Sequence, residues 1–223
     1  MTPAAATNTV TSTAATNTAA GSTAAAPTRG RPSTGARERI LDAAIEVLKS
    51  DGYAGLTIAK VAARAGESKP LVAYHFGSKR GLVQAAGRKI AEMITEEVLA
   101  SIDGATTVEE VIRGAAAGVE RVLDRDERVA RLYFDLAAVS VVDPGIRETI
   151  AEVNEQWRVV LTRLLGKSRD GLSRTRARVL TVMLIAGLQG MTLERIERGA
   201  TPERERAREL FIRSAVAAAA SAE

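Results

Sequence analysis

Apolar residues recur every three or four positions from Ala36 onward, and this helical period limits the possible folds more than any other feature of the sequence. Separate apolar stripes begin near Ile40, Ile58, Val72, Leu82, Val108, Val129, Ile146, Val179 and Ala207. No segment of alternating polar and apolar residues competes as a strand. The sequence therefore predicts an all-α fold of about nine helices and no sheet, in which three short helices form an N-terminal domain and the others a larger C-terminal domain.

The core must be filled mainly by aliphatic side chains, because hydrophobic residues make up 46% of the chain and aromatic residues only 3%. There is no cysteine, which excludes disulfides, thiolate zinc sites and thiol nucleophiles and fits a reducing compartment. The longest strongly apolar stretch, residues 179–191, is shorter than a membrane span requires. We therefore expect a cytoplasmic protein that does not enter a membrane.

Positive charge is concentrated in one short block near the N-terminus. Residues 29–89 contain 12 Lys and Arg against 5 Asp and Glu, whereas residues 90–223 contain 19 against 22. Such a distribution is typical of a chain in which one part meets a polyanion.

Composition and periodicity divide the chain into three parts. Residues 1–28 are an uncharged low-complexity run of Ala, Thr, Asn and Ser, which cannot bury enough apolar area to offset the entropy lost on ordering. We therefore predict a disordered tail with a basic arm over residues 1–35. A helix-turn-helix domain is predicted over residues 36–82, with the motif itself at 57–76, and a second helical domain over 83–223.

The motif is predicted from its capping residues. Thr57 and Ser68 are good N-caps for two short helices, and Gly66 permits the sharp turn between them. Val72 and Phe76 lie four residues apart and should face the core. The other side of the second helix carries Lys69, Pro70, Ala73 and Tyr74, and a surface of that width fits the major groove of DNA.

The stretch from Arg37 to Leu82 resembles the DNA-binding domain of TetR-family transcriptional regulators. The matching residues are RERILDAAIEVLKSDGYAGLTIAKVAARAGESK and then YHFGSKRGL. Within them stand the Thr-capped helix, the A-x-A-G-x-S turn, the aromatic-His-Phe triplet and the following Lys of the family pattern, as Thr57, residues 63–68, residues 74–76 and Lys79. The resemblance covers roughly 46 residues. The later helices match the family only in number and length.

The resemblance implies which residues touch double-stranded DNA. Tyr74 and His75 are expected to donate hydrogen bonds to phosphates, while Phe76 packs in the core. Thr57 and Lys79 lie at helix N-termini, where backbone N–H groups also favour phosphate oxygens. Ser68, Lys69 and Pro70 begin the recognition helix, and Lys69 and Pro70 are expected to approach base edges.

Two positions depart from the family pattern. Glu67 places a negative charge where the family usually has a small apolar residue, and Ala73 stands where an aromatic residue is frequent. Both leave the expected fold unchanged, but they weaken the transfer of individual DNA contacts.

The basic run Arg29-Gly30-Arg31-Pro32 lies in an extended segment before the domain. Arg29 and Arg31 on a flexible arm are suited to a narrow A·T-rich minor groove. The alternative is a solvated linker that carries two charges.

His75 was weighed as a metal ligand or a catalytic base, but the chain has no second histidine and no cysteine to share a metal. The glycines of residues 114–118 lack the Lys-Ser/Thr of a phosphate loop, so they favour close helix packing instead. No paired carboxylates or nucleophile–base arrangement supports an enzyme. We predict no catalytic residue, metal or cofactor.

In the family the middle helices enclose a pocket for a small-molecule effector. Trp157 is a candidate wall residue here because aromatic residues are so few, and four weaker candidates are Met93, Tyr133, Asn154 and Gln189. The alternative for each of them is ordinary packing or an exposed helix edge.

The last two helices are expected to form a homodimer. The stretch from Val179 to Ile196 is apolar nearly all round, which leaves more apolar surface than a monomer usually exposes. A two-fold four-helix interface would bury that surface and place two recognition helices about one DNA turn apart, as a palindromic operator requires.

Together these features indicate a repressor that a small-molecule effector releases from its operator. The alternative is an effector-independent DNA-binding activator or architectural factor. The residues alone do not choose the operator or the effector.

Overall fold

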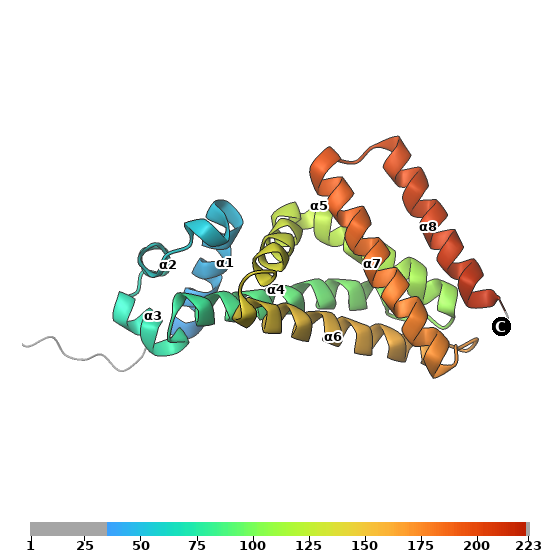
Figure 1. The fold of residues 1–223 in the computed structure, drawn as a ribbon, viewed down its shortest axis with the longest axis horizontal. Helices are drawn as coiled ribbons and strands as arrows, with labels where there is room; N and C mark the ends of the chain where they lie inside the picture. Colours follow the sequence, from blue (N-terminus) through green and yellow to red (C-terminus); the bar gives the residue numbers. More distant parts are fainter. Residues whose placement is uncertain (1–34, 222–223) are drawn as a thin grey trace, which may run out of the picture. The chain divides into compact units, whose positions relative to one another are not determined.

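Eight helices make up residues 35–221, the part of the chain that this computed structural model describes (Figure 1). They are α1 (Ala36–Gly55), α2 (Ile58–Ala65), α3 (Lys69–Phe76), α4 (Lys79–Ile102), α5 (Val108–Ser140), α6 (Pro144–Lys167), α7 (Arg174–Arg198) and α8 (Pro202–Ala220). These residues contain no strand, so the all-α prediction is confirmed for them. Residues 1–34 of the tail predicted over 1–35, with Arg29 and Arg31, lie outside the described residues.

The expected number of about nine helices is wrong for the described residues, because two predicted helices belong to α5. The stripes at residues 108–119 and 129–136 lie on either side of Asp126, whose extended backbone (φ −159°, ψ 92°) kinks the helix without ending it. The Asp126 carboxylate accepts hydrogen bonds from the Arg128 backbone N–H (3.1 Å) and guanidinium (2.9 Å). It therefore restarts the helix in the way that an N-cap does.

The predicted caps of the short helices are confirmed. The side-chain oxygens of Thr57 and Ser68 accept hydrogen bonds from backbone N–H groups three residues later, at 3.2 and 3.3 Å. Ser78 caps the long helix α4 in the same way, at 3.1 Å. Gly66 ends α2 in the left-handed region with φ 66°, which costs little only in the absence of a Cβ. The turn between α2 and α3 is therefore specified by residues that stand beside it in the sequence.

Two apolar cores hold the helices together. The first joins α1–α3 to α4, the second half of α5 and α6, and it includes Ile40, Val61, Val72, Leu82, Leu136 and Ile146. The second joins the first half of α5 to the C-terminal part of α6 and to α7 and α8, and it includes Ile112, Leu165, Leu184 and Ile212. The domain boundary predicted at residues 82/83 falls inside α4, so one continuous helix enters both cores. The division itself stays a prediction.

The glycines at residues 114 and 118 serve close packing of α5 on α4. A Cβ on Gly114 would lie 2.7 Å from the Ser101 carbonyl oxygen, and one on Gly118 would lie 2.6 Å from the Val98 Cα. The backbones approach too closely for any larger residue, which confirms the packing interpretation of this segment.

A buried ion network fastens the α7–α8 hairpin to α5. The Glu120 carboxylate on α5 contacts the guanidinium groups of Arg195 on α7 (2.5 Å) and of Arg204 on α8. The Arg204 side chain is only 2% exposed, so its charge is compensated almost entirely by the protein.

Helix α7 is long and apolar enough to cross a membrane by length and composition alone. Its residues Leu180, Leu184 and Leu188 are buried in the second core, while Val179 and Val182 are exposed. One such helix does not indicate a membrane span, since a core helix passes the same test.

Candidate nucleic-acid interface and internal cavity

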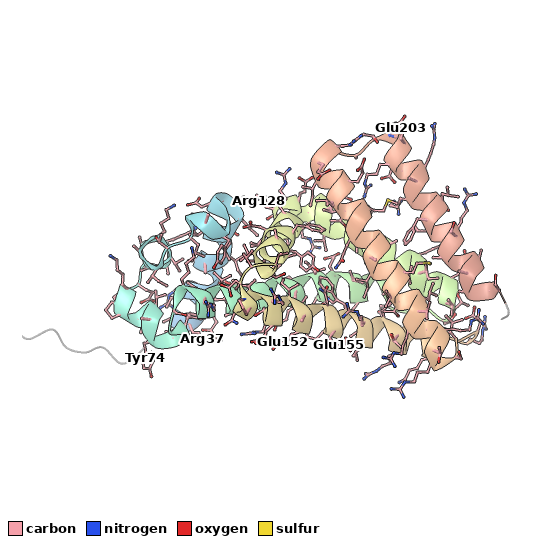
Figure 2. The ribbon with its side chains drawn as sticks, viewed as in Figure 1. Arg37, Tyr74, Arg128, Glu152, Glu155 and Glu203 are labelled. Carbon is pink, nitrogen blue, oxygen red and sulfur yellow. The ribbon has the colours of Figure 1, made fainter. Side chains whose placement is uncertain are left out.

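The outer face of α3 is exposed in the way that the sequence predicts. Val72 is fully buried beneath the helix, whereas Lys69, Pro70 and Ala73 are exposed and Tyr74 keeps 74% of its surface accessible. Figure 2 shows Tyr74 pointing away from the helices. The guanidinium of Arg37 lies 5.4 Å from the ring centre of Phe76 on the inner side. The outer face therefore combines the cation of Lys69, the phenol of Tyr74 and the small side chains of Pro70 and Ala73 on a short helix.

The negative charge of Glu67, one of the two departures from the family pattern, is neutralised within the protein. The Arg39 guanidinium on α1 contacts the Glu67 carboxylate at 2.6 Å, and the Glu67 side chain is only 13% exposed. The carboxylate is therefore paired beside the turn and repels a phosphate less than a free one would.

His75 and Lys79 are less available than Tyr74. His75 Nε2 is buried and has no hydrogen-bond partner among the described residues, so that nitrogen reaches a phosphate only if the ring moves. Lys79 Nζ donates to the Tyr53 carbonyl oxygen (2.8 Å) and lies 4.7 Å from the Tyr53 ring centre. Both residues stay predictions as DNA contacts, and Lys79 already has a structural role in joining α4 to the end of α1.

Thr57 and Ser68 are exposed at the start of α2 and α3, where their side-chain oxygens cap the helices. The first-turn backbone N–H groups of a helix face its N-terminal end, which is the geometry that favours an anion. Contact of these residues with phosphate stays a prediction.

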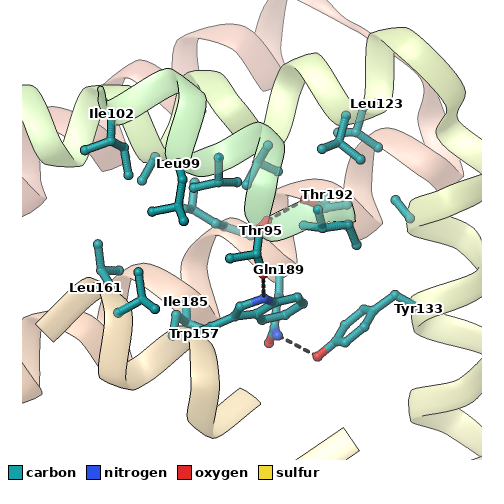
Figure 3. Close-up of a pocket in the computed structure, with 18 of the residues that line it drawn as sticks. Thr95, Leu99, Ile102, Leu123, Tyr133, Trp157, Leu161, Ile185, Gln189 and Thr192 are labelled. Carbon is teal, nitrogen blue, oxygen red and sulfur yellow. Dashed lines mark hydrogen bonds between the residues drawn. The ribbon is translucent and has the colours of Figure 1, made fainter. Parts of the chain in front are cut away.

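An internal cavity of about 130 Å³ lies between α4, α5, α6 and α7. Its walls are mostly aliphatic, and Figure 3 shows the Trp157 and Tyr133 rings with Thr95, Gln189 and Thr192 among them. The other lining residues are Ile94, Val98, Leu99, Ile102, Ala115, Val119, Val122, Leu123, Ala130, Phe134, Val160, Leu161, Leu164, Ile185 and Leu188. Within residues 35–221, no Asp, Glu, Lys, Arg or His lines this cavity.

The few polar groups around the cavity are bonded to one another. Trp157 Nε1 donates to the Thr95 hydroxyl at 2.8 Å. The Tyr133 hydroxyl donates to Asn154 Oδ1 (2.9 Å) and accepts from Gln189 Nε2 (2.8 Å). Burial raises the pKa of Tyr133, so the phenol is uncharged at neutral pH.

The structure brings four of the five predicted effector residues together. Trp157, Tyr133 and Gln189 line the cavity, and Asn154 lies behind them as a hydrogen-bond partner. Met93 does not line it and is 39% exposed, because α4 turns the neighbouring Ile94 and Thr95 toward the cavity instead. Thr95 and Thr192 were missed, although their spacing from Leu99 and Leu188 at i, i+4 could have placed them on the inner faces.

The second half of α5 connects the cavity with the N-terminal helices. It lines the cavity with Tyr133, and its Asp135 carboxylate accepts a hydrogen bond from the Tyr53 backbone N–H at the end of α1 (2.7 Å). Asp126 at the kink contacts Lys49 Nζ of α1 at 3.0 Å. A displacement of this half-helix would therefore disturb its two contacts with α1.

Comparison with known proteins agrees with this arrangement. A sequence profile described as "Bacterial regulatory proteins, tetR family" matches residues 40–86. The HTH-type transcriptional regulator CymR of Pseudomonas putida is 31% identical over 185 residues, which cover 78% of this chain and 89% of CymR. The HTH-type transcriptional activator FasR of Mycolicibacterium smegmatis is 29% identical, and the match covers 67% of each chain.

Solved structures are similar over most of the chain. The multidrug binding protein EbrR complexed with imidazole is 29% identical with a TM-score of 0.62, and the match covers 79% of this chain and 93% of EbrR. The same protein complexed with ethidium gives 28% identity and a TM-score of 0.64, with coverage of 80% and 97%.

Proposed function

Because this chain belongs to the TetR family of bacterial transcriptional regulators, we propose that it is a repressor which binds an operator through α2 and α3 and leaves it when a small molecule fills the cavity. The observation that carries the proposal is the outer face of α3. There Lys69 and Tyr74 are exposed on a helix whose other side is held by the buried Val72. A short capped helix of this kind presents side chains to the major groove while its first turn meets phosphates.

The cavity supports regulation by a ligand. It lies among α4–α7, and the half-helix of α5 that forms one wall is also bonded to α1 through Asp126 and Asp135. A ligand that binds better when α5 is displaced would favour a state with shifted N-terminal helices. Equal affinity for both states would shift nothing, so differential binding is part of the proposal.

A homodimer through α7 and α8 is also part of the proposal. Val179 and Val182 on α7 and Leu210 on α8 are large apolar side chains that are 67%, 56% and 58% exposed. Small exposed residues, Ala207 and Ser214, share the Leu210 face of α8 and would let a second copy approach closely. Sedimentation is expected to give a dimer at micromolar concentration, and a stable monomer would contradict this part of the proposal.

One relative, FasR, is named a transcriptional activator, which favours activation as the second candidate. The two candidates separate in the cell where the protein normally works. Bound DNA is mapped across the genome, and transcription of the adjoining genes is measured with and without this protein. A repressor raises those transcripts when it is deleted, whereas an activator lowers them; absence of bound sites would contradict both.

A further inference from the structure

The hydrogen-bonding capacity left in the cavity restricts the chemistry of its ligand. Two donors are used by neighbouring side chains: Trp157 N–H by the Thr95 hydroxyl, and Tyr133 O–H by Asn154 Oδ1. Neither hydrogen is free for a ligand.

The remaining donors on lining side chains are also used. Gln189 Nε2 donates both to the Tyr133 hydroxyl (2.8 Å) and to Asn154 Oδ1 (3.3 Å). The hydroxyls of Thr95 and Thr192 donate to carbonyl oxygens one turn earlier in their own helices, at 2.7 and 2.8 Å. Every side-chain donor in the cavity wall is therefore consumed within the protein.

Acceptors remain. Gln189 Oε1 has no hydrogen-bond partner among the described residues, and Figure 3 shows the amide nitrogen of Gln189 directed at Tyr133. The threonine oxygens keep lone pairs, because a hydroxyl can accept two hydrogen bonds in addition to donating one. A buried ligand acceptor would find no partner here, whereas a buried ligand donor would.

The same cavity wall disfavours a charged ligand. None of the Asp, Glu, Lys, Arg or His residues that the structure describes lines the cavity, and Tyr133, the titratable group among the described lining residues, stays neutral at pH 7. Burying an ammonium or a carboxylate without an opposite charge is far costlier than burying a neutral polar group.

The volume of the cavity limits the size of its ligand. The cavity holds about 130 Å³, and an apolar cavity of about 150 Å³ in another protein accommodates benzene. We propose that the cavity binds an uncharged, mostly apolar molecule of about one ring that carries a hydroxyl or N–H donor, as phenols do. This specifies the effector class of the regulator proposed above and rests on that function.

The test is a calorimetric titration of the full chain at pH 7, without DNA, using phenol, toluene, benzoate and benzylammonium. Phenol and toluene have the same shape and differ in the donor. Phenol is expected to bind, and the two ions are expected to bind on the order of 100-fold more weakly. Either ion binding as tightly as phenol would overturn the proposal.

The donor requirement is tested with Gln189→Met, which keeps the length of the side chain and removes Oε1 together with the Nε2 group that donates to Tyr133 and Asn154. The ratio of the phenol to the toluene dissociation constant is expected to rise roughly threefold to tenfold. Using the ratio cancels the different hydration of the two probes. An unchanged ratio would contradict the proposal.

Gln156→Met on the exposed side of α6 makes the same chemical change outside the cavity and should leave the ratio unchanged. Thr192→Val is the second variant, because it removes a cavity hydroxyl with almost no change in shape, and a smaller rise in the same ratio is expected. DNA binding is measured on the same preparations. Retained DNA binding without the expected selectivity overturns only the ligand class, whereas the expected selectivity without DNA binding overturns the proposed function.

Discussion

The outer surface of α2 and α3 and the internal cavity are specified by the chain in opposite ways. Each determinant of the surface acts within three or four residues: Thr57 and Ser68 cap the helices, and Gly66 turns the chain between them. The cavity is built from pairs far apart in sequence, such as Trp157 with Thr95 and Gln189 with Tyr133, which are separated by 62 and 56 residues.

The two regions therefore differ in how much sequence change their functions tolerate. A surface that neighbouring residues specify can be shared by many chains that contain the same motif. This sharing accounts for the profile match to residues 40–86. A cavity made by four helices changes its chemistry with any substitution that faces it. Ligand identity is therefore expected to differ among relatives more than the mode of DNA binding does.

The largest effect is expected from breaking the long-range scaffold of the cavity. Glu120→Gln leaves the buried Arg204 guanidinium without its main anion, and the half-exposed Glu205 carboxylate and the Met191 carbonyl oxygen stay as its partners. Removing one partner of such a pair costs about 3 kcal/mol in the free energy of unfolding, which urea denaturation measures. Glu209→Gln, which breaks the exposed pair with Arg113, should cost under about 1 kcal/mol. Equal small losses would show that the α7–α8 hairpin does not depend on this network.

The surface is tested by Lys69→Ala, which should weaken DNA binding by about 1–3 kcal/mol while leaving unfolding unchanged. Lys69 is exposed and contributes no packing. Lys167→Ala removes the same charge at the exposed end of α6 and serves as the control. Fluorescence anisotropy with one duplex measures both variants. If they weaken binding equally, net charge and not the α3 face governs affinity.

The connection between the two regions is tested by Asp135→Ala, which removes the acceptor for the Tyr53 N–H. The loss of DNA affinity that saturating phenol causes should shrink by about 0.5–2 kcal/mol. Asp103→Ala, in the exposed turn after α4, is the control. Anisotropy titrations with and without phenol give the coupling. An undiminished ligand effect would mean that the signal travels through α4 alone.

The smallest effect is expected on the pH dependence of stability, and it concerns the cap that Glu110 forms at the start of α5. Backbone N–H groups of Thr106 and Thr107 donate to Glu110 at the start of α5 and lower its pKa from 4.5 to about 2. A lowered folded-state pKa adds stability above pH 4.5, and that stability is lost as the pH falls toward 2. Glu110→Gln should therefore flatten the decline of Tm over this range. An equally steep decline in the variant would assign the acid sensitivity to other carboxylates.

The backbone that presents the surface could be predicted from the sequence, whereas the cavity could be predicted only in part. The caps, the turn and the division of α3 into a buried and an exposed side follow from neighbouring residues. Trp157 was predictable as a wall because aromatic residues are scarce. Met93 was misplaced because a helical stripe does not say which of two adjacent positions faces inward. The apolar stripes predict two helices where α5 is kinked at Asp126, since the cap at this kink depends on a side chain that also contacts Lys49 on α1.

Selection of bound sequences from a random duplex library at low salt shows whether the outer face of α3 reads duplex DNA. The wild-type chain is expected to enrich a palindrome whose half-sites lie about one helical turn apart. The Lys69→Ala, Tyr74→Ala double variant should enrich none. If the wild-type chain enriches no sequence, or the double variant enriches the same one, the proposal that this face reads duplex DNA is contradicted.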